Sequence, residues 1–554
     1  MDDVLAALPP GSLTKDVISY SVKINGSPLA GDVSLSEITV NKTFNKIASA
    51  KLVFLDGSVA DRDFELSNNQ SFKPGNEIEV LLGYDGSVET VFKGIIIKHG
   101  IKMRQQGPSV LLIEAKDKAV GLTMNRKRVY FNNKTDSTVM TTLAGSLSTD
   151  IEPTTLMHKQ LVQFDATDWD FLVTRAESNG MLVLTDDGKI IAKKPSTIQV
   201  PVFIAIYGDN IWEFEGEMDM RRQYAGVTSQ AWDYKNQALV TSNAWSGIFM
   251  EPGNIPSKDT GAVLNANLLL SHSGNIPKTQ LQAWSDAYVL RNKLSKAVGR
   301  VRVKGNAAVK PGTMITLLGV GDRFNGNVFV TGVLHHYEGL WQTDIQFGWR
   351  EDWFYKKEDV MDKPASGLLP GINGLQIGIV DDLNDQELGG QFRVKVHIPT
   401  VSGTNDGIWA RVATLDAGDK HGVYFRPQKS DEVVLGFLND DPRDPIILGY
   451  LHSKSNKEAP LPATANELHY GIVTKQGLKL IFDDTNKKLT LRVPSGSKEK
   501  TIIINDSGAI EMKDDNDNSI KMDSSGITIK STKGIKIDAG SANTTIKGSK
   551  VFIN

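Results

Sequence analysis

The 554-residue sequence contains no cysteine. This absence excludes disulfides, thiol nucleophiles and cysteine-ligated zinc or iron–sulfur sites. No stretch approaches the roughly 18 consecutive apolar residues that a membrane-spanning helix needs. An excess of charge of one sign is also missing, because 62 basic and 65 acidic residues give a net charge of −3. A general electrostatic attraction to nucleic acid or to anionic membranes is therefore not expected.

The beginning of the sequence lacks the features of a secretory signal peptide. It reads MDDVLAALPPGS, with acidic residues where a signal peptide needs a basic region, and its apolar run from Val4 to Leu8 is too short. We therefore expect synthesis and assembly in the cytoplasm. If the protein leaves the cell, a dedicated machine must expel it. The length predicts about three to four domains rather than one core.

The common catalytic motifs are absent as well. No G-x-S-x-G, H-E-x-x-H or GxxxxGK[ST] pattern occurs. His335 and His336 are neighbours on a predicted strand, where adjacent side chains point to opposite faces and cannot converge on one ion. The acidic run Asp514–Asn518 lacks the glycine and the final acidic ligand of a calcium loop, which favours a polar turn, although a structural cation stays an alternative. We expect no enzyme activity, no cofactor and no metal.

What the sequence does contain is a dense strand pattern from residue 392 to residue 451. Apolar residues alternate with Arg393, Lys395 and His397, the period of a strand with one buried face. Further short runs follow, separated by turns rich in Gly, Asp and Pro, with no helix between them. This spacing predicts a small closed Greek-key barrel of the OB type. The residues assigned to its core are Phe392, Val394, Val396, Ile398, Trp409, Val433 and Leu435.

The same stretch carries a family resemblance. The segments RVKVHIP, WARVATLDAG and SDEVVLGFLNDDPRDPIILGYL resemble the barrel module of VgrG proteins and of the central spike in contractile phage tails. This resemblance implies a mainly β protein with three parts. Residues 1–365 would be a hub with two β-barrels and a few helices, residues 366–460 an OB-fold-like collar, and residues 461–554 a trimeric β-helix, the needle of the spike.

The sequence of residues 1–365 agrees with their assignment as the hub. Short strands and turns fill residues 18–117 and continue, after an interruption, to Trp353. Two helices are predicted between them: one from Asp168, with Thr167 as its cap and Gly180 just past its end, and an amphipathic one over residues 278–299. FKPGNEIEVLLGY with VFKGIIIKH resembles the first barrel of the VgrG hub, and VFVTGVLHHY with WQTDIQFGW the end of the second.

The last ninety residues differ in composition. All nine tryptophans precede residue 410, and after Thr501 the only aromatic residue is Phe552. Short apolar pairs alternate with polar residues about every seven or eight positions, which predicts a β-helix. One chain with two small apolar residues per rung cannot offset an ordering entropy of roughly 1–2 kcal/mol per residue, so we infer a homotrimer. The residues assigned to the trimer axis are Ile520, Met522, Ile527, Ile529, Ile535 and Ile537.

The sequence ends in KVFIN, and no histidine follows His469. The chain therefore cannot build a metal-capped tip from histidine or cysteine. Three copies of this end would leave a blunt apolar platform with unpaired strand edges, a surface that seeks a partner. The family resemblance implies that a PAAR-like tip protein docks there. The residues assigned to this docking site are Val551, Phe552, Ile553 and Asn554.

Two functions follow from these patterns. The resemblance implies a structural hub and spike of a contractile injection system, either type VI secretion or an extracellular phage-tail-like particle. Its partners would be inner-tube and baseplate proteins, effectors or toxins and the target envelope, with no nucleic acid. The alternative is an OB-fold protein that binds oligonucleotides or sugars without a mechanical role. That alternative needs a basic groove with exposed aromatic residues, whereas the predicted barrel carries acidic turns beside its Lys and Arg.

Overall fold

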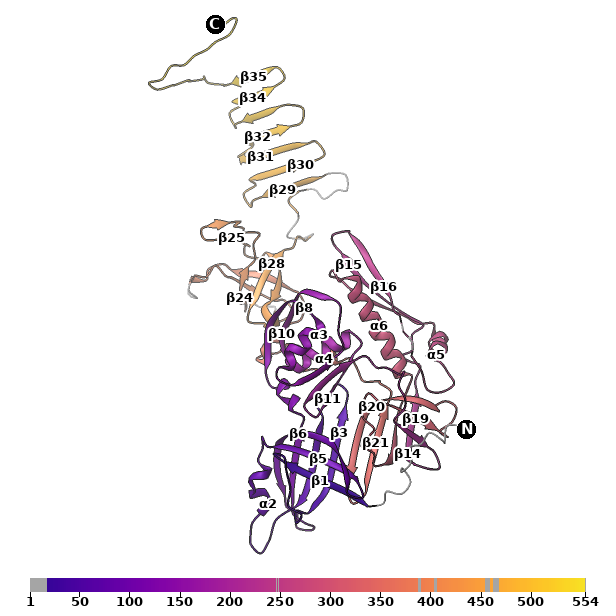
Figure 1. Ribbon diagram of the computed structural model, residues 1–554. Coiled ribbons are helices and arrows are strands. Elements are labelled where there is room, and N and C mark those ends of the chain that lie inside the picture. The colour runs from indigo at the N-terminus through magenta and orange to yellow at the C-terminus, as the bar shows by residue number, and fades with distance from the viewer. Residues whose placement is uncertain are drawn as a thin grey trace. The chain divides into compact units, whose positions relative to one another are not determined.

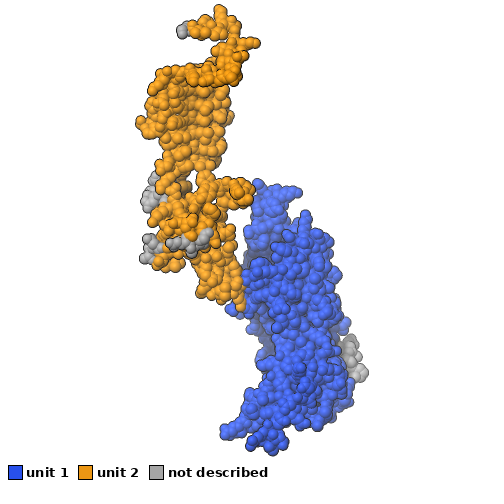
Figure 2. Space-filling view, turned by 90° about the vertical axis from the view of Figure 1, so that its left-hand side faces the viewer, with its two compact units in different colours: residues 1–362 blue, residues 363–554 orange. Residues whose placement is uncertain are grey.

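The computed structural model describes residues 17–245, 247, 249–386, 390–402, 406–453, 459–461 and 468–553. The chain divides into two compact units, residues 1–362 and residues 363–554, which Figure 2 colours separately. Both units consist mainly of β-strands, as the sequence predicts. No helix in the described ranges has the length and apolar character that crossing a membrane would require. The expected boundaries at residues 365 and 460 stay predictions.

A 13-stranded sheet forms most of the first unit (Figure 1). Its strands follow the order β14-β18-β21-β20-β3-β4-β7-β6-β5-β1-β2, and β13 and β19 attach beside β20. The bounds are β1 Ile18–Ile24, β2 Ser27–Pro28, β3 Leu35–Thr43, β4 Ser49–Leu55, β5 Glu77–Tyr84, β6 Ser87–Lys102, β7 Val110–Lys116, β13 Phe203–Ile206, β14 Ile211–Met218, β18 Ala297–Lys304, β19 Met314–Leu318, β20 Gly326–Tyr337 and β21 Trp341–Phe347.

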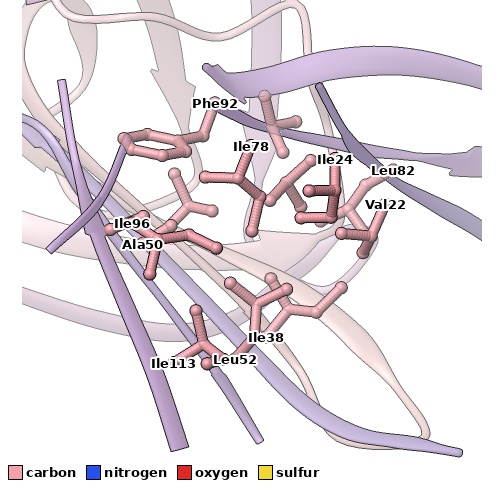
Figure 3. Packing of buried hydrophobic residues seen from close by; sticks show 14 of the residues in the cluster. Val22, Ile24, Ile38, Ala50, Leu52, Ile78, Leu82, Phe92, Ile96 and Ile113 are labelled. Carbon is pink, nitrogen blue, oxygen red and sulfur yellow. The ribbon is translucent and has the colours of Figure 1, made fainter. Parts of the chain in front are cut away.

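This sheet surrounds two separate hydrophobic cores. In the first, Ile38, Leu52 and Ile78 point toward one another between the strands of residues 18–116 (Figure 3). The second contains Val303 and Ile345 from strands of residues 203–347. Strands β3 and β20 pair antiparallel and join the two regions. The two barrel-like regions expected from the sequence are therefore parts of one continuous sheet.

A helical region packs around a third core, which includes Val139, Leu172 and Ile190. Its second helix begins where the sequence predicts, because the Thr167 hydroxyl accepts a 3.0 Å hydrogen bond from the backbone N–H of Asp170. The elements of this region are η2 Lys118–Thr123, β8 Arg126–Thr135, α3 Asp136–Ala144, β9 Ser148–Ile151, β10 Met157–Thr167, α4 Asp168–Ser178, β11 Leu182–Asp186, β12 Lys189–Lys193 and η3 Phe354–Lys356.

A three-stranded sheet carries the long amphipathic helix on one face. It contains β15 (Gly226–Asp233), β16 (Ala238–Asn243) and β17 (Asn267–His272), with α5 (Ser257–Leu264) and α6 (Lys278–Ser295) nearby in the chain. Helix α6 ends at Ser295, four residues before the expected stop at Gly299. Gly299 instead lies in β18, where an added Cβ would come within 2.2 Å of the Glu215 carbonyl oxygen. This glycine permits close strand pairing and does not end the helix.

The second unit begins with a closed five-stranded barrel, as predicted. Its strands are β22 (Gln376–Asp382), β23 (Val394–His397), β24 (Ile408–Val412), β28 (Pro445–Tyr450) and β27 (Glu432–Phe437), in that order around the barrel. Two short strands, β25 (Ala417–Gly418) and β26 (His421–Gly422), form a separate hairpin. The interior residues are Val380, Val394, Val396, Ile398, Ala410, Val433, Leu435 and Ile447.

Two residues assigned to this core from the sequence lie elsewhere. Phe392 is 71% exposed and has a φ of +59°, a left-handed conformation that precedes the start of β23. Trp409 is only half-buried and pairs with Lys395 on the outer face, while its neighbour Ala410 pairs with Val394 and fills the interior. Because side chains alternate along a strand, a shift of one position exchanges the two faces.

The chain continues into a seven-stranded antiparallel sheet, drawn as a single layer in Figure 1. Each strand pairs with its neighbours in sequence, so the expected β-helix is not confirmed for one chain. Lys487 and Asp517, both with positive φ, lie in the reversals between β30 and β31 and between β33 and β34. The strands are β29 His469–Val473, β30 Lys479–Asp483, β31 Lys488–Ser495, β32 Lys498–Asn505, β33 Ile510–Lys513, β34 Ser519–Asp523 and β35 Gly526–Lys530.

Residues 531–553 contain no strand. Ile535 and Ile537, expected on a further rung, are 55% and 68% exposed and belong to no sheet. In a single chain these isoleucines have no second layer to pack against. Pairing the segment would therefore gain too little to offset an ordering cost of roughly 1–2 kcal/mol per residue. The assignment of Ile535 and Ile537 to the axis of a trimer stays a prediction.

Candidate functional site

Two columns of apolar side chains cross all seven strands of the C-terminal sheet. The strand register places the members of each column directly opposite one another, and both columns lie on the same side of the sheet. We call these fourteen residues the apolar face. The first column contains Ile472, Leu480, Leu491, Ile502, Met512, Ile520 and Ile529, and the second contains Tyr470, Phe482, Leu489, Ile504, Ile510, Met522 and Ile527.

The apolar face is open to solvent in the single chain. Tyr470 is 56% exposed, Leu491 43% and Ile529 54%. A groove runs along it, lined by members of the first column together with Lys500, which lies opposite Val493 on the same side of the sheet. Contiguous exposed apolar surface of this kind marks an interaction site rather than an ordinary protein surface.

The opposite side of the same sheet is polar. Lys479 pairs with Arg492, and the column continues through Thr501, Lys513, Ser519 and Lys530. A second column on this side contains Ile481, Thr490, Ile503, Glu511, Lys521 and Thr528, so this side is mainly polar. The sheet therefore has one side suited to burial and one suited to water.

The structure places four of the six predicted axis residues on the apolar face: Ile520, Met522, Ile527 and Ile529. Ile535 borders the groove, but Ile537 does not. The ten other members were not assigned to the axis from the sequence. Their signal was present in GIVTKQGLKLIFDD and TIIIN, where apolar residues alternate as they do after residue 520.

The end of the chain is also exposed. Val551, Phe552 and Ile553 are 52%, 83% and 91% exposed, and no strand includes them. Asn554, the fourth residue of the predicted docking site, lies outside the described residues. The described part of this end offers three apolar side chains to solvent.

Among the buried charges of the first unit, Asp136 has the most complete set of partners. Arg175 donates to both of its carboxylate oxygens at 2.7 and 2.9 Å, and His158 Nε2 and Asn179 Nδ2 each lie 3.0 Å away. Burial acts to raise the pKa of Asp136, but the hydrogen bonds and charge of Arg175, with Asn179 and His158, hold that pKa below its usual value. These contacts tie α3 to α4 and β10.

The neighbouring histidines of β20 have different partners, as strand geometry predicts. His335 is buried with Nδ1 3.0 Å from Thr343 Oγ1, and burial lowers its pKa to about 3. His336 Nδ1 lies 3.3 Å from Thr39 Oγ1. Within the described ranges, no three His, Asp or Glu side chains form a group that could hold a metal. The Asp514–Asn518 run forms a polar turn in which Asp514 accepts from the backbone N–H of Asn516 and Asn518.

Two protein families match separate parts of the chain. Residues 14–339 match the family described as the Alg8 N-terminal domain, over more than half of the chain. The chain belongs to the Alg8 N-terminal domain family. Residues 376–452 match a second family, the type VI secretion system/phage-baseplate injector OB domain. These bounds coincide with the closed barrel, β22 to β28.

Individual relatives match shorter stretches. Over 68 residues the chain is 40% identical to the type VI secretion system spike protein VgrG3 of Vibrio cholerae, which covers 12% of this chain and 7% of that protein. Over 113 residues it is 31% identical to the spike protein VgrG1b of Pseudomonas aeruginosa, covering 19% and 15%. The matched part thus spans less than a sixth of either relative.

Among solved structures, a tail protein from Neisseria meningitidis is 16% identical, with a TM-score of 0.44 over 61% of this chain and 98% of that one. A TM-score below 0.5 supports no argument about the function of this chain. The injector OB domain and the VgrG relatives confirm the resemblance to a VgrG-like hub and spike. The oligonucleotide- or sugar-binding alternative is not supported.

Proposed function

We propose that this protein assembles as a homotrimer and serves as the hub and spike at the tip of a contractile injection apparatus. The spike would puncture a target envelope and carry a tip protein or effectors. The observation that carries this proposal is the apolar face, with fourteen exposed apolar side chains in register on seven strands. Within the described residues, no helix or second sheet packs on it.

Two further copies of the same chain are the occupants that best fit the apolar face. Three sheets around a threefold axis would place their apolar sides inside a narrow prism and leave Lys479, Arg492 and Lys513 facing water. The face is about half-exposed, so each side chain would contribute on the order of 1 kcal/mol on burial. Fourteen such contributions per chain are comparable with or larger than an association cost of about 4–15 kcal/mol.

The remaining parts fit the same role. The hub would contact inner-tube and baseplate proteins, and the barrel would join hub and needle. Val551 to Asn554 would bind a PAAR-like tip protein, with effectors or toxins attached to it or to the spike. Both a type VI secretion apparatus and an extracellular phage-tail-like particle provide such a position. The relatives named as type VI spike proteins support an injection role.

This role requires no catalysis by the chain itself. The buried Glu177 carboxylate accepts hydrogen bonds from Asn45 Nδ2 and Arg291 Nη1 at 2.8 and 2.9 Å, and from the backbone N–H of Phe354 at 2.8 Å. These contacts, like those of Asp136, support a scaffolding role for the two carboxylates.

Light scattering on the purified chain tests the proposal. The full chain should have three times the mass of 60.6 kDa. A truncation ending at Pro460, which lacks the C-terminal sheet, should be a monomer under the same conditions. A monodisperse monomer for the full chain would refute the trimeric spike. A dimer would instead indicate two sheets packed face to face.

A further inference from the structure

The end of the C-terminal region concentrates positive charge. Residues 524–553 contain five lysines and one aspartate, a net charge of +4, in a chain whose total net charge is −3. The rest of the chain therefore carries −7. We call these five residues the terminal lysines: Lys530, Lys533, Lys536, Lys547 and Lys550.

Most of the terminal lysines are available to a partner. All five belong to exposed positions. Lys536 Nζ lies 2.9 Å from an oxygen of Asp538. In the part of the chain that the structure describes, no carboxylate pairs with Lys530, Lys533, Lys547 or Lys550, whereas Lys513 and Lys521 nearby do have acidic partners. Four of the five charges are thus not neutralised within the chain.

Several of the terminal lysines stand next to apolar residues in the sequence. Lys530 lies on the polar side of β35, opposite Ser519, while Ile529 beside it belongs to the apolar face. Lys536 stands between Ile535 and Ile537 in the sequence, and Lys550 precedes the exposed Val551-Phe552-Ile553 end. When three apolar faces meet, Lys530 of each chain stays on the outside.

We propose that the terminal lysines bind the anionic headgroups of a lipid bilayer. Each lysine near an anionic membrane surface adds to the attraction, so a cluster of exposed lysines binds anionic headgroups. The inference rests on the proposed trimer for its multiplicity, because three chains would present fifteen such lysines around one axis. The spike would thus bind the membrane it meets as well as pierce it.

Lipid fits this surface better than nucleic acid. Proteins that bind single strands combine basic grooves with aromatic side chains on which bases stack. Phe552 is the only aromatic residue after Thr501, and it lies at the extreme end of the chain. The residues next to the other terminal lysines in the sequence, such as Ile529, Ile535 and Ile546, give no stacking platform.

Vesicle co-sedimentation of the full-length protein tests this inference. At low salt, the chain should sediment with phosphatidylcholine vesicles that contain phosphatidylglycerol and stay in solution with pure phosphatidylcholine. The variant K530Q/K533Q/K547Q/K550Q should lose at least about tenfold in partitioning to the anionic vesicles. The control K51Q/K73Q/K159Q/K258Q removes the same charge from exposed lysines of the first unit and should stay within about twofold of the wild type.

Other outcomes overturn the inference. Equal losses of vesicle binding in the two variants would mean that net charge alone determines binding. A wild-type protein that does not bind anionic vesicles would exclude lipid as the ligand. Tighter binding to a DNA oligonucleotide than to these vesicles would exclude it as well. Light scattering on the first variant should still give the wild-type oligomer, and loss of the oligomer would assign these lysines to assembly. A full chain that binds vesicles through the terminal lysines as a monomer would support this inference and refute the proposed trimer.

Discussion

Ile529 on β35 lies directly opposite Ile520 on β34, and both side chains belong to the apolar face. Thr528, one residue earlier, lies opposite Lys521 on the polar side. The two neighbouring positions therefore have opposite environments in the proposed trimer. Ile529 faces the shared axis, and Thr528 faces water.

Substitution of these two positions by the same residue separates the two environments. Ile529→Asp would place three carboxylates around the axis, each costing several kcal/mol to desolvate and repelling the others. We expect this variant to lose the trimer in light scattering and to melt at a lower temperature. Thr528→Asp should keep the mass and the melting temperature of the wild type. Equal tolerance of both changes would show that the apolar face is not the axis.

The predicted tip site can be tested by deletion. Removal of Val551 to Asn554 takes away three exposed apolar side chains and should abolish binding of a PAAR-like partner encoded beside this chain. The intact protein should co-purify with one partner per three chains. Replacement of Thr544 and Thr545 by alanine is the control and should leave the complex intact. A structure in which three C-termini fold into a closed, metal-capped apex would contradict the prediction.

The buried pair of Asp136 and Arg175 should be important for the stability of the first unit. Asp136→Asn leaves the buried Arg175 without its counter-charge, and we expect a loss of about 3 kcal/mol or more in the free energy of unfolding. Asp150→Asn is the matched control, because Asp150 pairs with Lys189 and Lys193 at the surface. Its effect should be about 0–1 kcal/mol. Chemical denaturation of both variants measures the difference.

The same pair predicts that the free energy of unfolding of the first unit depends on pH. The pKa of Asp136 lies below its usual value of 3.8 in the folded protein. The folded state therefore favours the ionised carboxylate, whose stabilisation is fully present above about pH 4 and is lost as the pH falls through the folded pKa. Asp136→Asn should flatten the fall in unfolding free energy below that pH. If the variant loses unfolding free energy at low pH as the wild type does, other carboxylates cause the pH dependence.

A close approach in the first unit gives a further prediction. An added Cβ at Gly305 would come within 2.0 Å of the indole of Trp341, which is only 2% exposed. Gly305→Ala should therefore destabilise the first unit by about 1–3 kcal/mol through overpacking. Gly100→Ala adds the same methyl group where nothing lies within 4 Å and should be close to neutral. Thermal unfolding of the two variants measures this difference in stability, and equal melting temperatures would contradict the prediction.

Local signals in the sequence predicted part of this fold. Thr167 and Asp168 specify the start of α4 through groups within one turn of each other, and the structure confirms that start. The closed barrel is also confirmed, and Val394 and Val396, which alternate with Arg393, Lys395 and His397, lie in its interior. The same alternation from residue 520 identified four members of the apolar face before any strand partner was known.

Features that depend on a partner strand were less predictable. Trp409 and Ala410 are both compatible with a strand, and only the pairing of Ala410 with Val394 decides which of them is inside. Phe392 continues the alternation of β23 by one step, but its backbone turns out of the strand. Ile535 and Ile537 repeat the pattern of Ile527 and Ile529, yet in one chain they have no layer to pack on.

The order in which β29 to β35 pair affects how the spike forms. Each strand hydrogen-bonds only to the strands before and after it, so the sheet contains almost entirely local contacts. Local contacts form quickly, whereas the meeting of separate chains is slower and depends on their concentration. Each chain can complete its own sheet before it encounters another. The three chains would then join as finished surfaces without winding around one another, and dilution should slow this last step alone.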